Sequence, residues 1–588
     1  MSKLYKMFAF LVLAAMVLGA CAPAATTAPT VVASATNVPT QAAATVPPKA
    51  TDTAAPAPTD TSVPPTATTE AKPKVATFMW TQEFDSLNPL YTNMWFSSIT
   101  QQLWDCWAWD FDDKDVPQPV LVKEIPSAQN GGVSADGKTI TLKLRDDLKW
   151  SDGEPLTSDD FMFTYKMTIN PKNTVATTHP YDLIDKLETP DKQTVVVTFK
   201  DPYAPWLYSM WRGIIPAHVL QPVFDKDGTI DGADWNKNPT VGCGPYVFDK
   251  WESGGYALFK ASDNYWLGKA KIDQIFIRFV PDDASQVAAL KNGEGDLGTF
   301  IAYSDVPDLQ KAGVDIKTVF SGYNEGVYFN LDSKLGNPAL QDVNVRKAIV
   351  MAIDRFSLDK DLLLGLTVPA ATDYDNTPYV DPTLKPYPFD PEGAKTLLDN
   401  AGWKLGADGV REKGGVKLTL KYGTTTREIR KDTQAVVQQQ LAAVGIKVEL
   451  LNYDSDVFFS DFANNGPAAK GELDMFEYSG SPAAPPDPDV AEWLCDQIPT
   501  ADKPQGTNWA HICDTELDQL FKDQIKQVDF AQRQATFQKI TKLIFDKVYW
   551  FGLWQDPDVW AVSKRLTNVR ISGAGCPFFN IMEWDLTP

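Results

Sequence analysis

The chain contains 588 residues, of which 76 are Asp or Glu and 54 are Lys or Arg, and its formal net charge is −22 at pH 7. Binding to nucleic acid requires basic patches that neutralise phosphates, so this charge argues against nucleic acid as a partner. The length is greater than a single hydrophobic core supports, and we therefore expect two or more lobes.

The N-terminus has the pattern of an exported lipoprotein. Lys3 and Lys6 precede an apolar run over residues 7–18, which is too short to cross a hydrocarbon core of ~30 Å but is typical of a signal peptide. The run ends in Leu-Gly-Ala-Cys, which resembles a bacterial lipobox with Cys21 as the lipidated residue. We predict a lipoprotein signal peptide over 1–21 and a protein anchored by lipid at the outer face of the cytoplasmic membrane, or in the periplasm. The alternative is an ordinary signal peptide with a chance Cys.

The segment over residues 22–74 has a different composition from the rest of the chain. It is rich in Ala, Thr and Pro and contains no aromatic residue. Such a segment does not bury enough apolar surface to offset the entropy of ordering it. We therefore predict a disordered stalk, stiffened by proline, that holds the remaining residues away from the membrane.

Strands and helices follow one another along the remaining residues. Residues that alternate or are rich in β-branched side chains predict strands over 75–80, 139–145, 194–199, 327–330, 418–421 and 446–450. Apolar residues at helical spacing predict helices over 161–167, 284–292, 345–353, 391–401, 431–444 and 530–546. The strand–helix–strand order over 418–450 indicates an α/β unit with parallel strands.

Cysteine and histidine are sparse. Five of the six cysteines follow Cys21, and the pair that flanks an eighteen-residue polar loop, Cys495 and Cys513, is the first choice for a disulfide in an exported protein. An odd number leaves at least one thiol free. The three histidines are scattered, so we expect no metal site and no cofactor. They are His179, His218 and His511.

Six stretches in chain order carry a family resemblance. They are Asp136-Gly137-Lys138-Thr139 with residues 144–161, Gly242-Cys243-Gly244-Pro245-Tyr246, Asn264-Tyr265-Trp266, Gly293-Glu294-Gly295-Asp296, residues 345–355, and Asp487-Pro488-Asp489. Together they resemble the family 5 extracellular solute-binding proteins, which are the oligopeptide-, dipeptide- and nickel-binding receptors of ABC importers. Most of these residues shape turns and helix starts, so they identify the fold without marking the site.

The resemblance implies an α/β fold of the periplasmic-binding-protein type (type II, cluster C), with two lobes, a hinge and an extra N-terminal subdomain. Lobe I is expected to combine residues 75–118, 241–333 and 553–588, with the extra subdomain over 119–240. Lobe II is expected over 334–552. Ligand is then trapped between the lobes by hinge closure and passed to ABC permease subunits and their ATPases.

The resemblance also points to a ligand-binding segment. Peptide receptors of this family hold the peptide ammonium with an Asp in a segment resembling Ser-Gly-Trp-x-x-Asp-x-x-x-Pro. The matching residues 479–488 keep Gly480 but have Ser481 in place of Trp and Ala484 in place of Asp. A buried ammonium needs a carboxylate. Either Asp487 or Asp489 therefore takes this role, or the ligand lacks a free amine.

Other candidate ligand-binding residues follow from their places relative to the family's cleft. They are Asn93, Met94 and Trp95 after the first strand, Phe300 and Tyr303, Arg427 in the loop after a lobe II strand, and Asn508 with Trp509. For each aromatic residue the alternative is packing in the core. The cluster of Trp104, Trp107 and Trp109 is expected to be core.

These observations predict a receptor and not an enzyme. No Ser-His-Asp order, HExxH or GxSxG motif supports a secreted hydrolase. A peptide is the preferred ligand because it is the common ligand of the family. An oligosaccharide is the alternative, since exposed aromatic rings suit stacking on sugars. A metal–chelate receptor and a receptor that senses a solute without importing it are further alternatives.

Overall fold

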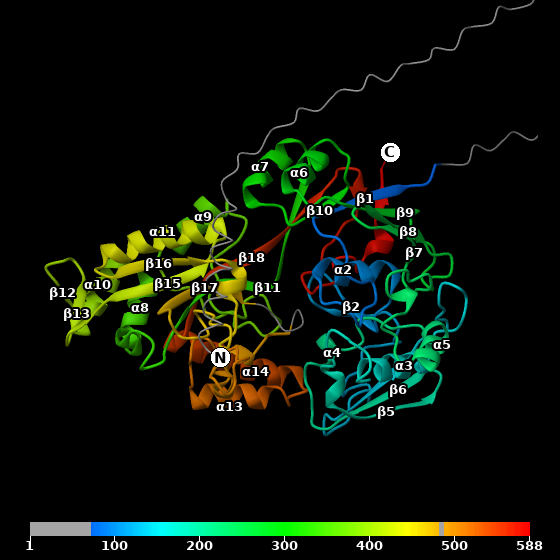
Figure 1. The fold of residues 1–588 in the computed structure, drawn as a ribbon, viewed down its shortest axis with the longest axis horizontal. Coiled ribbons are helices and arrows are strands. Elements are labelled where there is room, and N and C mark those ends of the chain that lie inside the picture. The colour runs from blue at the N-terminus through cyan, green and yellow to red at the C-terminus, as the bar shows by residue number, and fades with distance from the viewer. Residues whose placement is uncertain (1–71, 481–486, 588) are drawn as a thin grey trace, which may run out of the picture. The chain divides into compact units, whose positions relative to one another are not determined.

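The computed structural model describes residues 72–480 and 487–587 (Figure 1). The predicted signal peptide, Cys21 and most of the predicted stalk fall outside the described residues, and so do Ser481 and Ala484. Within the described ranges, no helix is both long enough and apolar enough to cross a membrane.

A ten-stranded mixed sheet is the largest sheet of the described chain. In spatial order its strands are β16 (Lys447–Tyr453), β15 (Thr419–Thr425), β17 (Met475–Gly480), β11 (Asp315–Phe329), β18 (Trp550–Val562), β10 (Leu297–Thr299), β1 (Val75–Trp80), β9 (Gln274–Phe279), β8 (Tyr256–Ala261) and β7 (Tyr246–Glu252). β15 and β16 are parallel and α11 (Glu428–Ala443) connects them, which confirms the predicted α/β unit.

Two long neighbouring strands, β11 and β18, connect the two ends of this sheet (Figure 1). Residues 324–329 of β11 pair with β17, whereas pairing with β18 extends over residues 315–328. β18 in turn pairs with β10 through residues 560–562. The hydrogen-bonded ladder from β15–β17 to β1 and β7–β10 therefore runs through these two strands.

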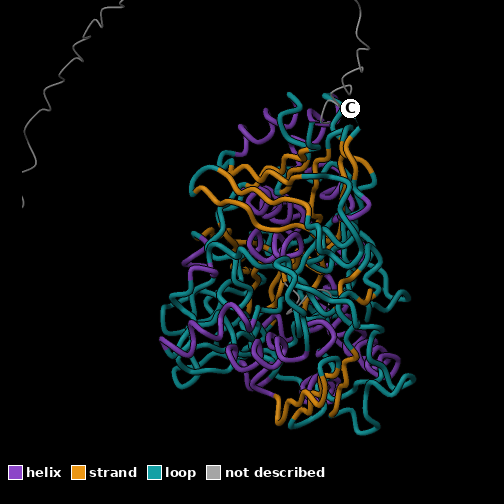
Figure 2. Tube along the Cα trace, turned by 90° about the vertical axis from the view of Figure 1, so that its right-hand side faces the viewer, coloured by secondary structure: helices purple, strands orange, loops and turns teal. Residues whose placement is uncertain are grey.

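Helices lie between the strands in sequence, and loops connect them over large parts of the chain (Figure 2). The α-helices are α2 (Trp95–Trp104), α3 (Ser158–Thr168), α4 (Trp206–Ser209), α5 (Ala217–Asp227), α6 (Asp283–Lys291), α7 (Val306–Lys311), α8 (Val343–Met351), α9 (Arg355–Leu362), α10 (Pro391–Asn400), α11, α12 (Ser455–Phe458), α13 (Thr515–Gln524) and α14 (Phe530–Lys547). The predicted helices correspond to α3, α6, α8, α10, α11 and α14.

Smaller sheets complete the fold. β4 (Thr139–Lys143), β6 (Thr194–Phe199) and β5 (Ile184–Asp191) form an antiparallel three-stranded sheet. β12 (Lys404–Leu405), β13 (Arg411–Lys413) and β14 (Val416–Lys417) form another, and β2 (Trp109–Phe111) with β3 (Pro117–Pro119) and β19 (Leu566–Thr567) with β20 (Asp585–Leu586) form pairs. Next to the first of these sheets, α3 begins at a capping box in which the Thr157 and Asp160 side chains exchange hydrogen bonds with the backbone.

The Gly-Cys-Gly motif packs against the end of α2. A Cβ atom on Gly242 would lie 2.2 Å from the Trp104 carbonyl oxygen, and one on Gly244 would lie 2.7 Å from two carbonyl oxygens of the same turn. Only glycine allows this close backbone approach. Cys243 between them forms a disulfide with Cys106, which the sequence did not single out.

Of the remaining cysteines, Cys495 and Cys513 form a second disulfide, and Cys576 is a buried free thiol.

Candidate functional site

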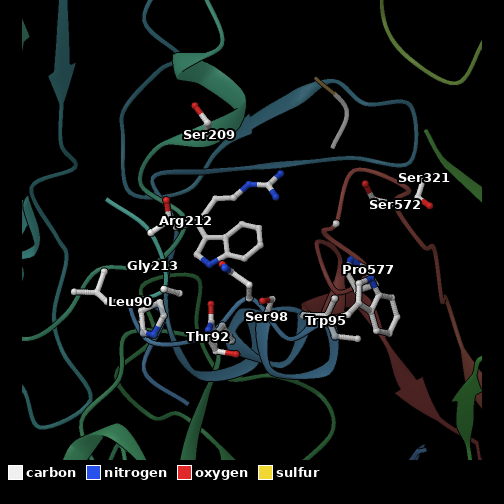
Figure 3. Close-up of a pocket in the computed structure, with 18 of the residues that line it drawn as sticks. Leu90, Thr92, Trp95, Ser98, Ser209, Arg212, Gly213, Ser321, Ser572 and Pro577 are labelled. Atoms are coloured by element: carbon white, nitrogen blue, oxygen red, sulfur yellow. The ribbon is translucent and has the colours of Figure 1, made fainter. Parts of the chain in front are cut away.

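A cavity of about 310 Å³ lies where α2 meets β11 and β18 (Figure 3). Its wall also includes parts of the segments over 176–181, 209–213 and 572–577. Elements far apart in sequence therefore build one site, and the two long strands of the sheet contribute to it. A second cavity, of about 450 Å³, is lined by residues 102–120, 245–267 and 570–583 and does not include β11 or β18. A solute held between two lobes must contact the elements that join them, which favours the first cavity.

Aromatic side chains form one wall of this cavity. Trp95, the first residue of α2, lies 5.8 Å from Trp560 of β18 and 5.1 Å from Phe300, as measured between ring centroids. Phe300 is 59% exposed and has a positive φ of 59°, so its ring is held out from the core beside Trp95. An exposed aromatic ring next to a cavity is typical of a binding surface.

The wall of the same cavity also includes the side chains of Arg212, His179 and Asp558. In Figure 3 the Arg212 side chain extends from its backbone toward the side of the cavity that carries Ser321 and Ser572. It stacks over the Trp107 ring at 5.1 Å and donates to the Ala574 carbonyl oxygen at 3.0 Å.

Asp558 is half-buried on β18. Burial raises the pKa of its carboxyl, a hydrogen bond with the Ser321 side chain lowers it, and the nearby Asp556 charge raises it, so that the pKa is about 6. Burial disfavours the ionised form, and the neighbouring like charge adds to this effect.

An irregularity in β11 brings Ser321 and Tyr323 to the cavity wall. Phe320 pairs with Pro557 and Asn324 with Gln555, so three residues of β11 oppose one residue of β18. Such a bulge bends the strand and redirects its side chains, and bulges are common next to binding sites.

One of the sequence-predicted residues, Tyr303, contacts Asp556 at the neighbouring part of the sheet. The Tyr303 hydroxyl donates to Asp556 at 3.1 Å, and Ser479, next to Gly480, donates to it at 2.9 Å. The Arg427 charge acts on the same group of residues, since it lowers the pKa of Tyr303, which burial raises. Gly480 also borders a small space beside Asp373 and Asp489.

A buried ion pair lies behind this group. Arg430 of α11 donates two hydrogen bonds to Glu325 of β11, at 2.8 and 2.9 Å, and both side chains are almost fully buried. Glu477 of β17 lies in the same interior, where burial and the Glu325 charge raise its pKa well above the ordinary value. This group fixes the relation of α11 to the sheet.

The structure brings some predicted ligand-binding residues to the cavity and leaves others away from it. Asn93 and Trp95 line it, and Phe300 packs against Trp95. Met94 precedes α2, and its carbonyl accepts the Ser98 N–H in the first helical turn. Trp509 packs beside Phe459 and Tyr478, with ring centroids at 6.1 and 5.9 Å.

Two further candidates form contacts within the fold. The Asp487 carboxylate is bound by Arg533 at 2.5 and 3.2 Å, and both side chains are less than 5% exposed. Asn508 is fully buried, and its amide donates to the Leu494 and Ile512 carbonyl oxygens. Both side chains are therefore engaged in holding loops together.

Sequence reasoning missed Asp558, Arg212 and Tyr323. For Asp558 a signal was present, because an Asp-Pro-Asp sequence interrupts an otherwise apolar strand. A charged residue inside such a strand indicates a functional site or a buried pair. Trp107 was expected to be core, and it is 5% exposed, although it also lines the cavity.

Residues 117–500 match the model of the bacterial extracellular solute-binding proteins, family 5 (middle). The chain belongs to this family. The family 5 protein is 27% identical to a Brucella ovis protein that is named as a peptide-binding protein of an ABC transporter. The alignment extends over 453 residues and covers 75% of this chain and 80% of the relative. It is 26% identical over 467 residues to the oligopeptide-binding protein AppA of Bacillus subtilis, covering 77% and 81%.

Solved structures show the same fold. The ABC transporter substrate-binding protein CtaP of Listeria monocytogenes superposes with a TM-score of 0.73 at 23% identity, covering 88% of this chain and all of that one. The predicted two-lobed α/β fold is thereby confirmed. The family comprises extracellular solute-binding receptors rather than enzymes.

Among residues 72–480 and 487–587, one group of side chains has the spacing of metal ligands, namely Asp105, Cys106 and Cys243. The two sulfurs are bonded to each other, so they are not available as thiolates.

Proposed function

We propose that the family 5 protein is the substrate-binding lipoprotein of an ABC importer. It captures a peptide in the cavity between α2 and the long strands and delivers it to permease subunits, which work with ATPases. The observation that carries this proposal is the cavity. Its wall includes residues of β11 and β18 and has aromatic, cationic and anionic side chains. A short peptide offers matching groups, since it has a charged end of each sign and apolar side chains.

The relatives support a peptide as the ligand, because two of the most similar ones are named for binding peptides. An oligosaccharide is the second candidate. It is favoured by Trp95 on the cavity wall and by the exposed Phe300 ring beside it, because aromatic faces stack on sugar rings. Mass spectrometry of ligand that co-purifies with residues 72–588 distinguishes the two. Thermal stabilisation by oligosaccharides and by no member of a peptide library would overturn the peptide proposal.

The domain boundaries from the sequence remain part of the proposal. Lobe I comprises 75–118, 241–333 and 553–588 with the extra subdomain over 119–240, and lobe II comprises 334–552. The hinge then lies in or next to β11 and β18, which join the two ends of the sheet. Small-angle scattering with and without the co-purified ligand tests this, because hinge closure reduces the radius of gyration.

We further propose that Cys21 carries the lipid and that residues 22–74 form the stalk. Expression of the full chain with Cys21→Ser should move the protein from the membrane fraction to the soluble fraction. Equal membrane association of the wild type and the variant would contradict lipid anchoring at this residue.

A further inference from the structure

Asp558 is an acid in the cavity whose charge the fold leaves unbalanced. It lines the wall from β18, and the Ser321 side chain hydrogen-bonds it. No side chain in the described ranges forms an ion pair with it. Asp487 differs in this respect, because Arg533 already neutralises it. Of these two acids, Asp558 is the one that remains available to a ligand.

The surroundings of Asp558 favour a positive group. Its carboxylate is half-buried, and the like charge of Asp556 is close by, so the ionised form is disfavoured until a cation approaches. A cation would relieve both effects. Arg212 and His179 also line the cavity, and within the described residues Asp556 is the one charged group that shifts the pKa of the Asp558 carboxyl.

The aromatic wall adds a second attraction. Trp560 follows Asp558 by two residues on the same strand but is only 1% exposed, so the half-buried Trp95 ring beside it is the indole that a ligand in the cavity can reach. Trp95 lies 5.8 Å from Trp560, between ring centroids. Ammonium and guanidinium groups are attracted to indole faces within about 6 Å of the ring centroid.

We propose that Asp558 binds a cationic group of the ligand, an ammonium or a guanidinium, in the cavity that the Trp95 ring also lines. In this way it performs the role that the sequence pattern assigns to an acid at the position of Ala484. The proposal rests on the proposed function in one respect, namely that the ligand occupies this cavity.

The test uses the chain from residue 72 to its end and three probes. The probes are a tripeptide library, the same library after N-acetylation, and putrescine, which is a diamine without a peptide group. Binding is measured by thermal shift and calorimetry on the wild type, Asp558→Asn and Asp558→Glu. Asp408→Asn is the matched control, because Asp408 is exposed and pairs with Lys417 far from the cavity in sequence.

We expect free-amine tripeptides to bind the wild type, and Asp558→Asn to weaken them about 10- to 100-fold, as is usual when a hydrogen bond to a charged group is lost. Acetylated peptides should bind weakly to both proteins. Asp558→Glu keeps the charge and should retain binding, which separates the loss of charge from a failure to fold. Asp408→Asn should resemble the wild type.

The outcomes separate the two proposals. Binding of putrescine alone, lost in Asp558→Asn, supports the role of Asp558 and overturns the peptide proposal. Equal binding of free and acetylated peptides to the wild type and Asp558→Asn overturns the role of Asp558 and leaves the peptide proposal standing. Binding of no cationic probe overturns the role of Asp558.

The pH dependence gives an independent readout. Because the pKa of Asp558 is about 6, affinity for the amine probes should rise between pH 5 and pH 7 in the wild type and stay constant in Asp558→Asn. His179 also lines the cavity, and its replacement serves as a control. His179→Gln should keep the pH dependence, and its loss in that variant would contradict the assignment to Asp558.

Discussion

If the Asp558 carboxylate has no cationic partner until a ligand binds, it should destabilise the folded protein in the absence of ligand. In the folded state burial and Asp556 raise the pKa of its carboxyl from the ordinary 3.8 to about 6. Charging this group is therefore easier in the unfolded chain than in the folded protein. Asp558→Asn removes that charge and keeps the shape of the side chain, so we expect the variant to be more stable than the wild type at neutral pH.

The size of the effect follows from the two pKa values. They differ by about 2, and each tenfold difference in proton affinity corresponds to about 1.4 kcal/mol, which gives an upper estimate of about 3 kcal/mol. Because the carboxylate is half-buried and remains partly hydrated, we expect about 1–3 kcal/mol. The folded-state pKa is the higher one, so the cost is absent below about pH 4, grows as pH rises, and is complete above about pH 6.

Thermal unfolding at pH 4, 5, 6 and 7 measures this. For a domain of ~500 residues an unfolding entropy of about 1 kcal/mol per kelvin converts the effect into a rise in Tm of about 1–3 °C at pH 7. No rise is expected at pH 4. Asp408→Asn should show no such gain, because Lys417 holds the pKa of Asp408 below its ordinary value. A difference between wild type and Asp558→Asn that is the same at every pH, or a less stable variant at pH 7, would refute the reasoning.

Three further predictions concern stability. Asp487→Ala leaves the buried Arg533 guanidinium without its carboxylate, and the free energy of unfolding measured in urea should fall by about 3–5 kcal/mol; a loss below about 1 kcal/mol would argue against a buried pair. Gly244→Ala places a methyl group 2.7 Å from two carbonyl oxygens, so circular dichroism should report a lower Tm or no folded protein, and a wild-type Tm would contradict that packing. Replacing both cysteines of the Cys106–Cys243 disulfide by Ser should lower the free energy of unfolding by about 5 kcal/mol, and replacing both cysteines of Cys495–Cys513 should lower it by about 3 kcal/mol. The difference arises because the first disulfide joins residues 137 apart in sequence and the second joins residues 18 apart. The reverse order of Tm values would contradict the loop-entropy argument.

The sequence was informative where local patterns decide the structure. α11 and the two parallel strands beside it followed from helical spacing and β-branched residues. The motif glycines were assigned to backbone geometry, and Gly137 and Gly153 indeed have φ values of 69° and 96°. In each case the residues that determine the structure are neighbours in sequence.

Long-range pairing was the part that sequence reasoning could not supply. Cys106 and Cys243 are 137 residues apart, and nothing local to either indicates the other as its partner. The pairing of β11 with β18 likewise joins residues that are distant in sequence. Its bulge, which turns Ser321 toward the cavity, depends on a register between strands more than 200 residues apart. Only the fold brings these residues together.

Asp487 and Asp558 show what this means for a binding site. Position in the family pattern favoured Asp487 as a ligand anchor, and the Asp-Pro-Asp sequence in an otherwise apolar strand was the only sign of Asp558. The structure instead favours Asp558 as the ligand anchor. Arg533 of α14 forms an ion pair with Asp487, whereas no cation among the described side chains forms an ion pair with Asp558. Whether a carboxylate can bind a ligand thus depends on whether the fold has already paired it, and that pairing is set by contacts distant in sequence. The proposed cation site at Asp558 on β18 therefore does not depend on the acid that the family pattern has at the position of Ala484.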